Sequence, residues 1–173
     1  MVRVLENPRS GERFVIHRTG AETNGHLLEF EVFLQPHAHV PAMHAHPNQE
    51  ERFTVVSGNV RFRVAGKNTV LGPGDSVTVS SGTSHWFGNV GDGVAQLRVE
   101  VRPALRMEEL FETTVRCADS DAGVWFRRML DWALILLDFR GELAVPNVPT
   151  WLVTASLSPL AWLRQRLLRV SGT

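Results

Sequence analysis

The chain has 173 residues, of which 43% are hydrophobic and 21% are charged. These proportions indicate a globular protein with one ordinary domain and exclude an intrinsically disordered chain. Lysine plus arginine and aspartate plus glutamate number 18 each, so the formal net charge is zero with histidine neutral. A balanced charge gives no electrostatic reason to expect nucleic acid as a partner.

Cysteine content and hydropathy bear on the cellular location. Cys117 is the single cysteine, so an internal disulfide is excluded and no oxidising compartment is required. The N-terminal sequence MVRVLENPRSGERF lacks the apolar centre of a signal peptide, and no uncharged apolar run reaches the roughly 18–20 residues that span a bilayer. We therefore expect a cytoplasmic protein with no membrane partner.

The first hundred or so residues have the pattern of an all-β domain. Short runs rich in Val, Phe, Leu and Thr predict strands, and glycine-rich turns separate them. The predicted strands are Leu27–Leu34, Phe53–Val56, Val60–Val64, Ser76–Val79 and Ala95–Val101. No helices alternate with them, so the pattern favours a sandwich or barrel over a parallel sheet.

The pattern changes to helical spacing after Pro103. It predicts helices over Met107–Ala118 and Val124–Arg140, the second ended by Gly141, and a third helical stretch that ends in the basic segment Trp162–Arg169. We expect a β-barrel over residues 1–104 and a helical extension over 105–173, packed together as one structural domain. Packing on the barrel or in a dimer is favoured over a mobile lid for these apolar helices.

A histidine pair and a glutamate form the first candidate site. On an extended strand, side chains at i and i+2 point to the same face, so His44 and His46 project together. A turn at Pro47-Asn48 then brings Glu51 to the start of the next strand, where it can face the same cavity. Two imidazoles and one carboxylate converging in this way indicate a divalent transition-metal site.

A second segment, Gly74–Asn89, adds His85 as a fourth candidate ligand just after a Gly-centred turn. Together the two segments resemble the two motifs of the cupin superfamily, G-x5-H-x-H-x(3,4)-E-x6-G and G-x5-P-x-G-x2-H-x3-N. His44, His46, Glu51 and Gly58 match the first motif; Gly74, Gly82, His85 and Asn89 match the second. The resemblance implies a small single-domain cupin, a double-stranded β-helix or jelly roll, with its metal on His44, His46, Glu51 and His85.

Two motif positions depart from the family pattern. Ala38 stands at the opening glycine of the first motif and Ser80 at the proline of the second. Neither is a presumed ligand, so the departures concern turn geometry. Glu50 has the opposite strand parity to Glu51 and is expected to point outward, and the further pair His37 and His39 is expected in a loop at the barrel rim.

The resemblance implies one divalent metal, with iron(II) preferred and manganese, nickel or zinc as alternatives. The expected function is a metal-dependent enzyme, a dioxygenase acting on a small apolar or aromatic molecule. Two alternatives stay open: a metal-dependent isomerase, cyclase or decarboxylase of a biosynthetic pathway, and a non-catalytic small-molecule-binding protein. A homodimer is the expected assembly.

Overall fold

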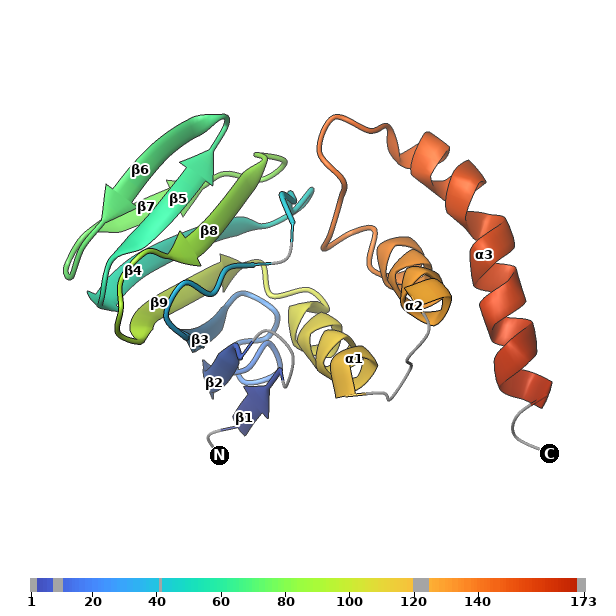
Figure 1. Cartoon of the computed structure of the whole chain (residues 1–173), viewed down its shortest axis with the longest axis horizontal. Helices are drawn as coiled ribbons and strands as arrows, with labels where there is room; N and C mark the ends of the chain where they lie inside the picture. Colours follow the sequence, from blue (N-terminus) through green and yellow to red (C-terminus); the bar gives the residue numbers. More distant parts are fainter. Residues whose placement is uncertain (1–2, 8–10, 41, 120–124, 171–173) are drawn as a thin grey trace.

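The computed structural model describes residues 3–7, 11–40, 42–119 and 125–170. These residues form nine strands followed by three helices (Figure 1). The strands are β1 (Arg3–Glu6), β2 (Arg13–Arg18), β3 (Leu28–Leu34), β4 (Glu50–Ser57), β5 (Val60–Val64), β6 (Lys67–Leu71), β7 (Ser76–Val79), β8 (His85–Asn89) and β9 (Ala95–Arg102). The helices are α1 (Met107–Asp119), α2 (Trp125–Asp138) and α3 (Thr150–Val170).

The strands form two antiparallel sheets that face each other. The larger sheet has the order β1-β2-β3-β9-β4-β7 and the smaller has the order β6-β5-β8. Alternate residues of β3 are buried, which gives this strand one face in the core. Phe53 of the larger sheet packs on Phe62 and Phe87 of the smaller, with ring centroids 5.3 and 5.1 Å apart. The predicted all-β barrel with a helical tail is confirmed.

All five predicted strands are present, and β4 begins three residues before the predicted Phe53. The sequence pattern did not predict β1, β2, β6 and β8. Strand β6, KNTVL, is an edge strand whose residues are exposed except the half-buried Leu71, so it lacks an apolar alternation. Strand β8, HWFGN, contains glycine and asparagine, which are typical of turns.

The predicted helices are confirmed with small changes at their ends. Helix α2 ends at Asp138, two residues before the predicted Arg140, while the predicted first residue, Val124, lies outside the described residues. Met107 and Leu110 of α1, with Ile135 of α2 and Phe139 just after it, belong to the same buried cluster as the barrel strands. The first two helices therefore help to complete the core.

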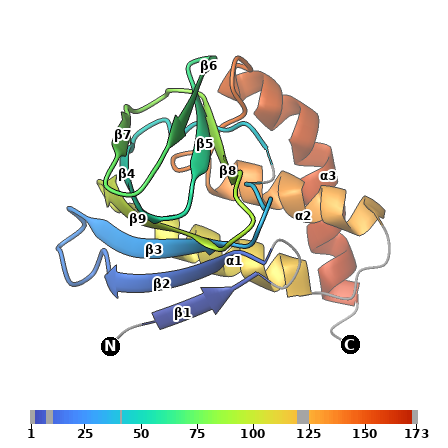
Figure 2. The ribbon, with the colours of Figure 1, turned by 60° about the vertical axis from the view of Figure 1, so that its left-hand side comes forward.

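Helix α3 packs on α2, away from the barrel (Figures 1 and 2). Trp151 and Trp162 are 71% and 59% exposed, so α3 buries little of its aromatic surface. Among the described residues, the helices are too short or too polar to cross a membrane.

Two motif residues have structural roles close to the barrel. Gly58 has φ of +80°, and a Cβ atom there would lie 2.9 Å from the Cα of Ala95, so the turn between β4 and β5 requires glycine. Asn89 is buried; its Nδ2 donates to the carbonyls of Leu34 and Gly93, and its Oδ1 accepts from the amide of Gly91. Asn89 therefore holds two loops together at one end of the barrel.

Candidate metal centre

Three histidines from two separate segments meet inside the barrel. The backbone of His44 pairs with that of His85 through two hydrogen bonds, N to O, of 3.0 and 2.8 Å. His46 lies on the same side as His44, and the ring centroids of the three histidines are 4.3–5.3 Å apart. One nitrogen from each ring lies within 4.8 Å of the other two. His44, His46 and His85 are therefore at metal-binding distance from one another.

Backbone carbonyls orient all three rings. Nδ1 of His44 faces the carbonyl of Ala42 at 2.9 Å, Nδ1 of His85 faces that of Thr83 at 3.1 Å, and Nδ1 of His46 faces that of Glu142. A carbonyl is an acceptor, so each neutral ring carries its proton on Nδ1 and leaves the Nε2 lone pair unprotonated. Hydrogen bonds from Nδ1 to a carbonyl orient an imidazole so that it can bind a metal through Nε2.

Glu51, the second residue of β4, completes the cluster. Its Oε2 lies 2.9 Å from Nε2 of His85 and 3.4 Å from Nε2 of His46. Oε2 of Glu51 and Nε2 of His85 are both buried and have no partner in hydrogen-bonding geometry. Unprotonated Nε2 and a carboxylate oxygen are both acceptors, so their approach is favourable only with a cation or proton between them. The donor set fits a divalent metal.

The cluster also shifts the pKa values of its members. Burial, with the nearby imidazoles of His85 and His46, lowers the pKa of His44 to about 4. Burial would raise the pKa of Glu51, but the imidazoles of His46, His85 and His44 outweigh it and lower the pKa to about 2. Burial would lower the pKa of His85, but the adjacent Glu51 carboxylate raises it. At neutral pH the site therefore keeps an ionised Glu51 and a neutral His44.

These shifts predict how metal affinity depends on pH. Below the raised pKa of His85 a metal must displace the proton of that ring, so affinity should fall as the pH decreases, by about tenfold per pH unit for each proton displaced. The fall should steepen near pH 4, where His44 also protonates, while Glu51 stays ionised. Cobalt titrations from pH 8 to pH 4 in non-coordinating buffers measure this slope. Affinity that is flat between pH 8 and pH 5 would contradict the three-histidine site.

The chain after α2 runs alongside residues 44–48, which carry His44 and His46 and are called the ligand segment below. Ala45 and Ala144 pair through two backbone hydrogen bonds of 3.1 and 2.9 Å, and Nδ2 of Asn48 donates to the carbonyl of Gly141 at 3.0 Å. With the bond from His46 to the Glu142 carbonyl, residues 141–144 contact the ligand segment at three points. Nothing in the sequence pattern signalled this pairing, because it joins segments about 96 residues apart through backbone atoms.

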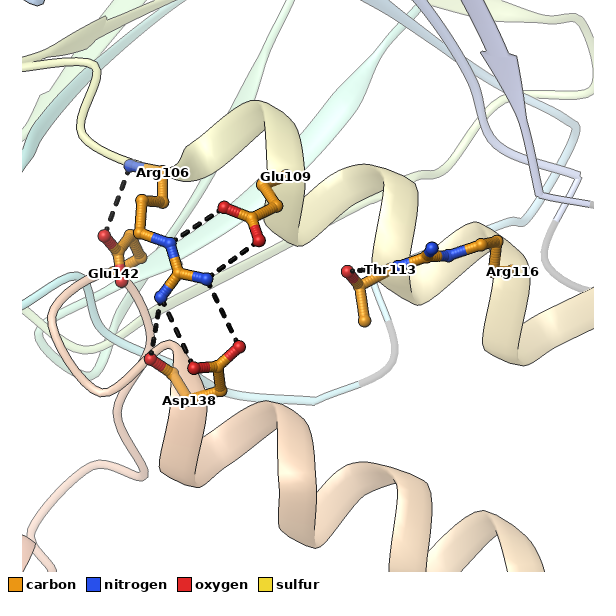
Figure 3. Close-up of polar contacts among 6 residues, drawn as sticks. All are labelled: Arg106, Glu109, Thr113, Arg116, Asp138 and Glu142. Atoms are coloured by element: carbon orange, nitrogen blue, oxygen red, sulfur yellow. Dashed lines mark hydrogen bonds and ion pairs between the residues drawn. The ribbon is translucent and has the colours of Figure 1, made fainter. Parts of the chain in front are cut away.

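A polar cluster links this segment to the start of α1 (Figure 3). The Glu142 carboxylate accepts a hydrogen bond from the amide of Arg106 at 3.2 Å. The Arg106 guanidinium donates to Glu109 at 2.8 Å and to Asp138 at 3.2 Å, which joins α1 to the end of α2. Glu142 therefore contacts the residue before α1 through its side chain and His46 through its carbonyl.

The centre opens into a cavity of about 630 Å³. His44, His46 and Glu51 line one part of it, beside Phe53 and Phe87. The same cavity continues to residues of α1 and α2. Within the described part of the chain, no lysine or arginine lines it.

The residues set aside on sequence grounds lie away from the cluster. Glu50 is exposed, as its strand parity predicted. His37 is exposed, with Nε2 3.5 Å from Asp92, and the ring of His39 lies tilted against Trp86 with the ring centroids 5.5 Å apart. Cys117 is half-buried and lines the cavity, which its sequence context did not predict.

Comparison with known proteins agrees with this geometry. Residues 30–101 match the family model described as the cupin domain. These residues form a cupin domain. No curated protein sequence matches it. The match covers most of the barrel and includes His44, His46, Glu51 and His85, while α1–α3 lie outside it.

Solved structures show the same fold at low sequence identity. An RmlC-like cupin from Shewanella frigidimarina has a TM-score of 0.54 and 21% identity, covering 62% of this chain and 89% of that chain. The cupin domain of Schizosaccharomyces pombe Cnp3 has a TM-score of 0.52 and 12% identity, covering 62% and 73%. KdgF from Halomonas sp. has a TM-score of 0.51 and 18% identity, covering 57% and 84%. These likenesses concern the fold alone.

Proposed function

We propose that this cupin is a metal-dependent dioxygenase that acts on a small apolar or aromatic molecule bound through an oxygen atom. The observation that carries the proposal is that three histidines lie at metal-binding distance from one another, with the Glu51 carboxylate against His46 and His85, beside an apolar cavity. We take His44, His46, Glu51 and His85 as the ligands and iron(II) as the preferred metal. A divalent ion there would supply a Lewis acid with open positions, and iron(II) would also supply redox chemistry with dioxygen.

The protein's own groups suit this role. Three neutral imidazoles add no charge and Glu51 adds one negative charge, so a divalent site keeps a positive charge that attracts an enolate or phenolate oxygen. Phe53 and Phe87 provide an apolar surface beside the ligands. A dioxygenase transfers both oxygen atoms of O2 to its substrate, so the reaction needs no external reductant.

The lining of the cavity argues against a phosphorylated sugar as substrate. Glu12, Glu51 and Asp131 line the cavity, and the described lining residues include no lysine or arginine to bind a phosphate. A cavity that reaches His44 and His46 also supports a catalytic or ligand-binding site over a barrel filled by side chains.

A second candidate is metal-dependent isomerisation, cyclisation or decarboxylation without oxygen. Glu12 and Asp131, two buried carboxylates in the same cavity, favour it, because such reactions need an acid or base near the substrate. The homodimer stays a prediction, for which the exposed Trp151 and Trp162 of α3 offer apolar surface.

Oxygen dependence separates the two reactions. The protein is purified anaerobically, its metal is identified by elemental analysis, and iron- and zinc-loaded samples are incubated with catechols and 1,3-diketones. We expect oxygen consumption by the iron form, and its loss in Glu51→Gln. Turnover by the zinc form under nitrogen would instead support the isomerase or decarboxylase. No turnover in either form with the metal bound would contradict both.

A further inference from the structure

The floor of the cavity extends across much of the larger sheet. Phe53 of β4, Val99 of β9 and Phe30 of β3 lie directly opposite one another in the strand register, and all three line the cavity. Phe14, on the next strand, β2, lines it as well. Neighbouring strands are about 4.8 Å apart, so three steps from β4 to β2 span about 14 Å.

Helix α1 forms a wall of similar length. The residues of α1 that line the cavity recur at helical spacing and form one stripe: Met107, Leu110, Phe111, Thr114, Cys117 and Ala118. At about 1.5 Å per residue this stripe is about 16 Å long. Helix α2 adds a second wall with Asp131, Trp132, Ile135 and Leu136.

The metal centre lies at one end of this space. Nε2 of Gln49 donates to the carbonyls of Pro103 and Ala104, just before α1, and Glu142 joins the Arg106 amide to His46. Met107 is therefore at the end near the histidines. Cys117 lies about 15 Å farther along the helix, at the opposite end.

The far part of the cavity is mainly apolar. Phe111 of α1 stacks on Phe14 at 4.8 Å and contacts Phe30 edge-on at 5.1 Å, so aromatic rings join the helix to the floor. Glu12 and Asp131 each have an interaction within the chain, so a ligand need not supply a cation for them. A molecule confined to the ligand end would leave this apolar surface uncovered.

We propose that the cavity binds an elongated molecule, with one oxygen-donor headgroup at the histidines and an apolar body that runs along α1 toward Cys117. This inference rests on the proposed function and defines its substrate class. A volume of about 630 Å³ lies in the usual range for sites that enclose a drug-sized molecule. A medium-chain acyl group and a fused aromatic system share the required shape.

Hydroxamates of different length test this assignment on the cobalt-loaded protein, with cobalt absorption as the readout. Octanohydroxamate and 2-naphthohydroxamate should bind about a hundredfold more tightly than acetohydroxamate, because their bodies bury apolar surface. A larger gain in affinity for octanohydroxamate identifies the body as acyl, and a larger gain for 2-naphthohydroxamate identifies it as aromatic. Equal affinities for all three would overturn the proposal.

A paired substitution localises the effect to α1. Thr114→Trp places a large side chain in the cavity and should reduce the preference for the long ligands to about threefold, with acetohydroxamate affinity unchanged. The control is Thr113→Trp, since Thr113 accepts a hydrogen bond from Arg116 and does not line the cavity (Figure 3). An unchanged preference in a folded Thr114→Trp would contradict the assignment.

Alkylation of Cys117, the single cysteine, gives a readout that needs neither metal nor a variant. Octanoate should slow its reaction with iodoacetamide about tenfold in the metal-free protein, whereas acetate should leave it unchanged. Protection by octanoate together with failure of acetohydroxamate to bind the cobalt form would support the cavity assignment and contradict the proposed metal chemistry. No protection at saturating octanoate would contradict the apolar body.

Discussion

Deletion of residues 120–173 is expected to leave a barrel that neither folds stably nor binds a metal. The deletion removes Ile135 and Phe139, which are 2% and 1% exposed and belong to the barrel core. Burial of two such side chains stabilises by about 3–6 kcal/mol, a large part of the 5–15 kcal/mol typical of a domain. The truncated protein should aggregate or unfold at ordinary temperature, as measured by circular dichroism and size-exclusion chromatography.

The same deletion removes direct support of the ligand segment. His46 loses its carbonyl partner on residue 142, and Ala45 loses both hydrogen bonds to Ala144. Loss of the hydrogen-bond partner of a metal ligand, here an outer-sphere partner of His46, typically weakens metal affinity by about 10–100-fold. A soluble, folded, metal-loaded fragment would show that the helices serve access to the site and not its structure.

A shorter deletion provides the control. Removal of residues 149–173 takes away α3, which packs on α2, and leaves α2 and residues 141–144 in place. This variant should keep the barrel and bind one metal with the affinity of the full chain. Equal loss of metal in both deletions would place the support on α3 instead of on the segment after α2.

Burial of one face of an element and tertiary packing between distant segments leave different traces in a sequence. Runs rich in Val, Phe and Leu predicted β3 and β9, and helical spacing predicted α1 and α2, because these elements bury apolar side chains that leave a pattern in the sequence. The edge strand β6 has little buried surface and therefore no such pattern. The sequence predicted that His44, His46 and His85 meet, because His44 and His46 are two residues apart on an extended strand and all three histidines match motif positions.

Other parts of the site depend on tertiary packing and left no local signal. The Glu142 carbonyl can be supplied by any residue, so its role beside His46 is independent of the glutamate side chain. Met107–Ala118 was predicted as a helix from its spacing, and whether its apolar face contacts side chains or encloses a cavity depends on α2. The sequence therefore predicted the meeting of the three histidines better than the shape of the cavity.

Replacement of a single ligand is expected to abolish stoichiometric metal binding without unfolding the protein. Glu51→Gln keeps the volume of the side chain but removes the one negative charge of the cluster, and His46→Ala removes one Nε2 donor. Because loss of an outer-sphere partner already costs about 10–100-fold, loss of a ligand should cost at least about a hundredfold in affinity. Isothermal titration with zinc and elemental analysis after dialysis measure the loss.

Neighbouring residues supply matched controls for both variants. Glu50→Gln makes the same chemical change one residue earlier, on an exposed side chain of β4, and His39→Ala removes a histidine that contacts Trp86 outside the cluster. Both controls should keep one metal per chain and near-native affinity.

Loss of the Glu51 charge also removes the group that raises the pKa of His85, so metal-free Glu51→Gln should protonate His85 at lower pH. Histidine NMR titration detects that shift; full metal occupancy in Glu51→Gln, with His85 titrating as in the parent protein, would show that this carboxylate is not a ligand.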